Sequence, residues 1–116
     1  MIDKPHLDEE ALAELQDVME DEFEVLIQTY LADSRTRLDS LRETLKAEDA
    51  DAFAKAAHSF KGSCINIGAP HLGELCMRAE QLGKAGTLAT APAIIAAIEE
   101  EFAEVSSRLE AFGEAS

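Results

Sequence analysis

The segment that decides the fold is DADAFAKAAHSFKGSCINIGA, residues 49–69. Its apolar residues recur at intervals of three and four, which is the spacing of one face of an α-helix. At about 100° per residue these positions fall within about 40° of a single direction, which indicates the side that faces a core. They are Phe53, Ala57, Phe60, Cys64 and Ile67. Asp49 can cap this helix and Gly68 can end it, so the sequence predicts a helix over residues 50–67.

Two helices are predicted before this one. A short helix runs from Asp8 to about Val18, and Leu7 and Leu12 are spaced to pack against each other across its first turn. A second helix fits residues 21–47, because its apolar positions keep the same alternation of threes and fours. These positions are Phe23, Ile27, Tyr30, Ser34, Leu38, Leu41 and Leu45.

Two more helices are predicted after it. One begins at about Pro70 and runs to Leu82, with Leu72, Leu75, Cys76, Ala79 and Leu82 on one face. Gly83 and Gly86 are expected to stop it, which makes residues 83–91 the longest candidate for irregular structure. Pro92 opens the last helix, whose core rhythm continues for three heptads. Its core positions are Ile95, Ile98, Phe102, Val105, Leu109 and Phe112.

One short helix and four longer ones, joined by brief connections, favour an all-α fold. We expect an antiparallel up-down-up-down four-helix bundle with a short N-terminal capping helix, formed as one domain by residues 1–116. The composition agrees with this fold. Hydrophobic residues make up 47% of the chain but aromatic residues only 5%, and sheets prefer aromatic and β-branched side chains.

The charge of the chain limits its partners. The formal net charge is -14, which argues against sequence-independent binding to nucleic acid or to an anionic membrane. No segment resembles a signal peptide, and no apolar run is long enough to cross a bilayer, so we expect a cytoplasmic protein. The charge is also uneven. Residues 53–86 carry four basic and two acidic side chains, or +2, which leaves -16 for the remainder.

One histidine lies on the outward side of the helix over residues 50–67. His58 is about 140° from the core direction, and Ala54, Lys61, Gly62 and Ile65 fall on the same outward side. Gly62 costs about 1 kcal/mol relative to alanine inside a helix, and in return it leaves room for a bulky group beside the imidazole. The pattern indicates a locally basic, partly apolar surface around one nucleophilic nitrogen. The alternative is an ordinary surface histidine with a lysine neighbour.

No metal or cofactor site is predicted for this chain. Cys64 and Cys76 fall on core faces and are expected to be reduced hydrophobic residues. A site built from them with His58 and His71 is rejected, because His58 faces away from both cysteines. His6 precedes the first helix and is expected to be solvated. The chain also has no phosphate-binding loop and no paired acidic cluster suited to Mg²⁺.

Two stretches together resemble a known family. AHSFKGSCINIGA at residues 57–69, with LGELCMRAEQLGKAG at 72–86, is similar to the signature of histidine-containing phosphotransfer (HPt) domains, over about residues 49–86. The resemblance implies that His58 is the phosphoacceptor, that Lys61 stabilises the phosphoryl group and that Gly62 gives access. It also implies that Glu80 lies near the site, where relatives often have glutamine.

The residue at position 80 raises a question of charge. A carboxylate repels a phosphoryl group unless a cation or a partner intervenes, so Gln81 or Lys84 is considered as a substitute for Glu80.

The resemblance further implies a relay without kinase activity. A phosphoryl group passes from the receiver-domain aspartate of a hybrid sensor kinase to His58, and then to the aspartate of a response regulator, with the receiver supplying Mg²⁺. Partners are expected over the outward surface around His58, with help from the first helix, and a monomer is expected. The partner-binding candidates are Ala54, Ser59, Ile65, Glu80, Gln81 and Lys84. The rival hypothesis is a helical adaptor that binds a signalling partner without receiving phosphate.

Overall fold

Five α-helices and one short 3₁₀ turn account for most of residues 4–114, the part of the chain that the computed structural model describes. The helices are α1 (Glu9–Met19), α2 (Glu22–Lys46), α3 (Ala50–Ile67), α4 (Pro70–Ala85) and α5 (Ala91–Glu114), with the 3₁₀ turn η1 (Leu88–Thr90) before the last. The all-α prediction is confirmed.

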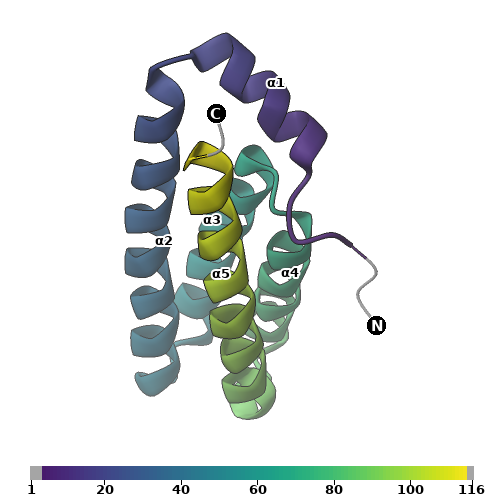
Figure 1. Cartoon of the computed structure of the whole chain (residues 1–116). Coiled ribbons are helices and arrows are strands. Elements are labelled where there is room, and N and C mark those ends of the chain that lie inside the picture. The colour runs from purple at the N-terminus through teal and green to yellow at the C-terminus, as the bar shows by residue number, and fades with distance from the viewer. Residues whose placement is uncertain (1–3, 115–116) are drawn as a thin grey trace.

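The four long helices lie side by side and α1 crosses one end of them (Figure 1). Successive helices from α2 to α5 run in opposite directions, as in an up-down-up-down bundle. The bundle is elongated, with extents of 43 × 27 × 19 Å. Because α1 lies across the end of the four long helices, the predicted capping position of the short first helix is confirmed.

The core follows the predicted helix faces. Every core position predicted from the apolar rhythm is buried, apart from Leu45, Leu82 and Phe112, which are partly buried against the core. The predicted caps also form. The Asp8 side chain accepts a hydrogen bond from the amide of Ala11, and the Asp49 side chain accepts one from the amide of Ala52. Gly68 adopts a left-handed conformation, with φ of 88°, at the end of α3.

The end of α4 differs from the prediction. The helix continues through Gly83 to Ala85 and ends at Gly86, whose φ is 72°. Gly83 is buried, and a Cβ atom built there would lie 2.8 Å from the Cβ and the amide nitrogen of Ala54 on α3. The prediction that Gly83 stops the helix is wrong, because this glycine allows two helices to approach closely. The irregular segment is correspondingly shorter than residues 83–91, since η1 and α5 follow directly.

The position of Ala54 also differs from the prediction. The sequence placed it on the outward side with His58, but it is only 6% exposed, because it packs beneath Gly83. The helical wheel defined one core direction for α3, whereas α3 is covered by α2 on one side and by α4 on another. The buried arc is therefore wider than the apolar rhythm alone indicated.

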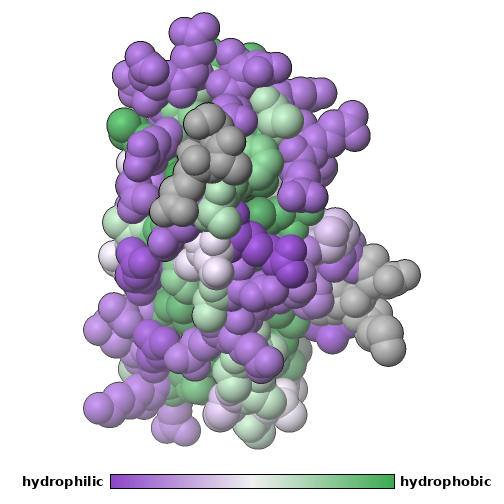
Figure 2. Space-filling view, in the orientation of Figure 1, coloured by the Kyte–Doolittle hydropathy of each residue, from purple (hydrophilic) through white to green (hydrophobic). Residues whose placement is uncertain are grey.

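The surface of the bundle is largely hydrophilic. Figure 2 shows hydrophilic side chains over most of the face turned to the viewer, with hydrophobic ones in a band between them. Within residues 4–114, none of the helices is both long enough and apolar enough to span a membrane.

Candidate functional site

His58 is exposed, as predicted. It lies on α3 and 67% of its side chain is accessible to solvent. The ring is held through one nitrogen, since Nδ1 lies 3.0 Å from Oε2 of Glu80 on α4. In the part of the chain that the structure describes, this is the only hydrogen bond of the ring. One side of the imidazole is therefore fixed by the protein and the other faces solvent.

Glu80 is the centre of a charged cluster. The residue is only 5% exposed, and its carboxylate accepts hydrogen bonds from the ammonium groups of Lys61 and Lys84 as well as from His58. The Lys61 Nζ atom lies 2.8 Å from Oε1, and the Lys84 Nζ atom lies 3.0 Å from Oε2. The pKa of Glu80 is lowered to about 2. The main cause is the hydrogen bond from Lys61, and burial acts in the opposite direction by raising the pKa. Glu80 is thus ionised at neutral pH.

The ionised carboxylate determines the tautomer of His58. A carboxylate only accepts hydrogen bonds, so Nδ1 must carry the hydrogen atom in the contact with Glu80. In the neutral imidazole the lone pair then belongs to Nε2, which is the nitrogen not engaged by Glu80. The site therefore presents a nucleophilic nitrogen of defined identity.

Glycines on α4 explain how a buried glutamate reaches an exposed histidine. A Cβ atom at Gly73 would lie 3.3 Å from the Ile65 side chain, and one at Gly83 would overlap Ala54. Both glycines face α3, and Glu80 lies between them in the sequence, one turn before Gly83. The close helix contact brings its carboxylate to the surface of α3. This arrangement was not predicted, because Gly83 was expected to end the helix.

The space beside His58 is open. A Cβ atom added to Gly62 would have no heavy atom within 4 Å other than those of the adjoining backbone of α3, which confirms the predicted vacancy one turn after the imidazole. Ile65 is 60% exposed, so the predicted apolar residue on this surface is also confirmed. Lys61 is less exposed than its predicted outward position implies, because its side chain is directed to Glu80 and only 23% of it is accessible to solvent.

The structure answers the question raised about position 80. Glu80, and not Gln81, contacts His58, while Gln81 is exposed beside Leu82 on another face of α4. Lys84 joins the cluster through Glu80. The cations that a carboxylate would need beside a phosphoryl group are thus present, and substitution by Gln81 is not part of the arrangement.

A groove between α2 and α3 extends from His58. Its lining includes Leu26 and Arg37 of α2, with Ser59 and Gly62 of α3. The Arg37 guanidinium donates a hydrogen bond to the hydroxyl of Ser59, next to His58. Arg37 was not predicted as a site residue, because nothing in its spacing shows that α2 places it opposite Ser59.

The cysteines are core residues, as predicted. Both are free and buried. The Tyr30 hydroxyl lies 3.2 Å from the Cys64 sulfur, and burial raises the pKa of Tyr30 well above its usual value. A hydrogen bond with Cys64 and burial likewise raise the pKa of the Cys76 thiol. The Tyr30 hydroxyl and the Cys76 thiol are thus protonated at neutral pH.

His6 departs from the prediction of a solvated side chain. Its Nδ1 atom lies 2.6 Å from Oε2 of Glu101, and its ring stacks on that of His71 with centroids 5.7 Å apart. The prediction holds only in part: 38% of the His6 side chain is exposed, but backbone hydrogen bonds hold the N-terminal segment on the bundle. The amide of Asp8 donates to the carbonyl of Gly68, and the amide of His71 donates to that of Pro5.

The fold and the site define a class of protein, a helical bundle that presents one exposed imidazole beside a compact cluster of charges. The family model described as Hpt domain matches residues 25–108, so this chain belongs to the Hpt domain family. It is similar to histidine-containing phosphotransfer protein B (HptB) from Pseudomonas aeruginosa PAO1. The crystal structure of that protein matches with a TM-score of 0.92 and 45% identity, over 97% of each chain. No curated protein sequence matches.

The family defines the general activity. This is a phosphotransfer protein of a phosphorelay and is not a kinase. Membership of the family also implies interaction with receiver domains.

Proposed function

We propose that His58 accepts a phosphoryl group from a receiver-domain aspartate of a hybrid sensor kinase and passes it to the aspartate of a response regulator. The observation that carries this proposal is the pairing of an exposed imidazole with a buried, ionised carboxylate. Contact between Nδ1 of His58 and Glu80 leaves Nε2 as the nucleophile.

In the accepting step, the Nε2 lone pair attacks phosphorus in line with the bond to the receiver aspartate. The N–P bond forms, the P–O bond breaks, and the aspartate leaves as a carboxylate. Because Nδ1 keeps its hydrogen atom, the ring gains a positive charge as Nε2 is phosphorylated. The Glu80 carboxylate, 3.0 Å from Nδ1, stabilises that charge. In the donating step the second receiver aspartate attacks phosphorus, and Nε2 recovers its lone pair.

Lys61 and Lys84 balance the charge of Glu80 next to the phosphoryl group. Each ammonium has three hydrogen atoms, and the bond to Glu80 uses one of them, which leaves others for phosphoryl oxygens. The phosphoryl group therefore meets two cations as well as one carboxylate. In this proposal the chain adds no cofactor to the transfer, and the receiver domain supplies Mg²⁺.

The receiver domain docks over the open surface around His58. Gly62 leaves space for it, Ile65 gives an apolar contact, and Ser59 and Arg37 give polar contacts at the α2–α3 groove. Lys84 is exposed at the edge of this surface on α4, whereas Gln81 lies on another face of that helix and is not part of the proposed contact.

Ala54 was predicted to contact partners, but it is buried and is therefore excluded from the proposed contact residues. We place the relay in the cytoplasm, where Cys64 and Cys76 remain thiols, and expect a monomer.

The experiment mixes the protein with a phosphorylated receiver domain that carries labelled phosphate. We expect an acid-labile, alkali-stable label on the wild-type chain and no label on His58→Gln. The matched control is His71→Gln, which also removes a histidine from the bundle and should be labelled like the wild type. Equal labelling of His58→Gln would refute the proposal. If His58→Ala also keeps partner binding and full biological activity, the adaptor hypothesis is favoured instead.

A further inference from the structure

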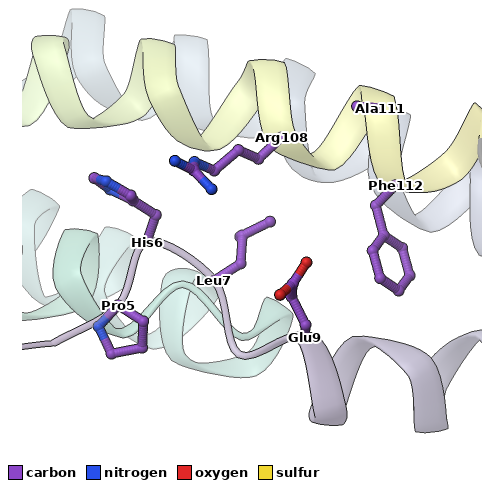
Figure 3. A pocket seen from close by; sticks show the side chains of 7 residues that line it. All are labelled: Pro5, His6, Leu7, Glu9, Arg108, Ala111 and Phe112. Atoms are coloured by element: carbon purple, nitrogen blue, oxygen red, sulfur yellow. The ribbon is translucent and has the colours of Figure 1, made fainter.

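A second cluster of metal-ligating side chains lies apart from His58. It combines His6 from the N-terminal segment, His71 from the first turn of α4 and Glu101 from α5. One ligand atom from each residue can be chosen so that all three lie within 4.8 Å of one another. Figure 3 shows a pocket between the N-terminal segment and α5. His6 and Arg108 lie at one end of this pocket, and Phe112 lies at the other. Three separate segments of the chain thus meet at this point.

The hydrogen bond of the His71 ring leaves its Nε2 atom free to bind a metal ion. Its Nδ1 atom lies 3.1 Å from the backbone carbonyl of Lys4. A carbonyl oxygen only accepts, so Nδ1 carries the hydrogen atom and Nε2 carries the lone pair. Metal-binding histidines in proteins are oriented in this way, with the second ring nitrogen donating to a carbonyl or carboxylate.

Glu101 supplies a buried negative charge. Only 8% of its side chain is exposed, and Nδ1 of His6 is 2.6 Å from its Oε2 atom. If His6 Nδ1 and that oxygen both bound a tetrahedral metal ion, they would be roughly 3.3 Å apart, so the pair needs to open by less than about 1 Å. A neutral His6 that binds the metal through Nδ1 carries its hydrogen atom on Nε2 instead, so metal binding moves this hydrogen from one ring nitrogen to the other.

The surrounding charges favour a cation. Glu104 places Oε1 4.0 Å from Nε2 of His6, which adds a second carboxylate at the edge of the cluster. The Arg108 guanidinium is paired with Glu104, and the Lys4 ammonium is paired with Glu74. With neutral histidines, these two cations and the three carboxylates give a local charge of -1.

We propose that His6, His71 and Glu101 bind one Zn²⁺ ion through two imidazole nitrogens and one carboxylate oxygen, with water in the remaining position. Nitrogen and carboxylate donors in this number suit zinc, whereas Mg²⁺ and Ca²⁺ prefer sites made of oxygen atoms. The ion joins residues 4–8 to α4 and α5, and so holds α1 over the end of the bundle. The site is separate from His58 and contributes nothing to phosphoryl transfer.

The test uses untagged, metal-free protein titrated with Zn²⁺ in the presence of excess Mg²⁺, which occupies sites made only of carboxylates. We expect saturation at one ion per chain and a rise in Tm when zinc is bound. His71→Gln and Glu101→Gln should each weaken zinc binding by at least about 100-fold, since even the loss of an outer contact to a ligand costs about 10- to 100-fold. Co²⁺ in place of zinc should give the visible absorption of a tetrahedral ion.

The matched control is His58→Gln, which removes an exposed histidine that also contacts a glutamate and should leave zinc binding unchanged. Circular dichroism checks that each variant is folded, and His71→Gln keeps the proposal falsifiable if Glu101→Gln unfolds. The proposal is overturned if zinc does not saturate at one ion per chain, or if folded His71→Gln binds zinc as the wild type does. In that case the cluster is an ion pair between His6 and Glu101.

Discussion

Glu80→Gln tests the central interaction of the site. The change keeps the size of the side chain and one hydrogen-bond acceptor but removes the negative charge that Lys61, Lys84 and His58 share. A fall in the pKa of Glu80 from its usual 4.5 to about 2 corresponds to a stabilisation of about 3 kcal/mol at neutral pH. Lys84 and His58 are two-thirds exposed, and solvent screens their share, so we expect a loss of about 1–2 kcal/mol in Glu80→Gln at pH 7.

The effect of Glu80→Gln on the free energy of unfolding should depend on pH. The folded-state pKa of Glu80 lies below the unfolded value, so its stabilisation is present above pH 4.5 and is lost as the pH falls toward 2. The difference in unfolding free energy between the wild type and Glu80→Gln should therefore be largest at pH 5–7 and should shrink steadily below pH 4.5.

The assay is urea denaturation followed by circular dichroism, at a series of pH values for each protein. The matched control is Glu74→Gln on the same helix, where the ion pair with Lys4 is longer, 3.4 Å, and the lysine is half exposed. This control should cost less than about 0.5 kcal/mol. A Glu80→Gln variant as stable as the control at pH 7, or a difference that does not change with pH, would refute the reasoning.

Three further substitutions probe the packing around the site. Gly83→Ala should destabilise the bundle by about 1–3 kcal/mol in urea denaturation, because its Cβ would meet the Cβ and backbone of Ala54; wild-type stability would mean that α3 and α4 can separate without cost. Gly62→Gln should leave stability unchanged or higher, since the position is open, but should slow phosphotransfer from a receiver domain in a time course; an unchanged rate would contradict the access argument. Tyr30→Phe should lower stability by about 1 kcal/mol, because it removes the buried hydroxyl that contacts Cys64, and an equal midpoint and slope in urea would show that this contact contributes nothing.

The apolar rhythm was sufficient to predict most of the fold. Helices longer than ten residues repeat their core positions many times, so Phe53 to Ile67 or Ile95 to Leu109 define a face even if one position is misread. The caps at Asp8 and Asp49 were also predictable, because their hydrogen bonds involve residues only three positions away. The exposure of His58 follows from the same local geometry.

Contacts between helices were not predictable in this way. Glycine is common both at helix ends and at close helix crossings, and only the packing of α4 against α3 shows that Gly83 serves the second purpose. The burial of Ala54 and the placement of Arg37 beside Ser59 depend on the same kind of contact.

The sequence by itself determined the helices, the direction of the core and the solvent exposure of His58, because these depend on residues within a few turns of one another. Only the tertiary structure decided that Glu80 holds Nδ1, that Lys61 and Lys84 balance its charge, and that His6 meets His71 and Glu101. The physical reason is one of scale. Helical periodicity specifies which way a side chain points to within tens of degrees, whereas a hydrogen bond requires two atoms from different helices to lie about 3 Å apart.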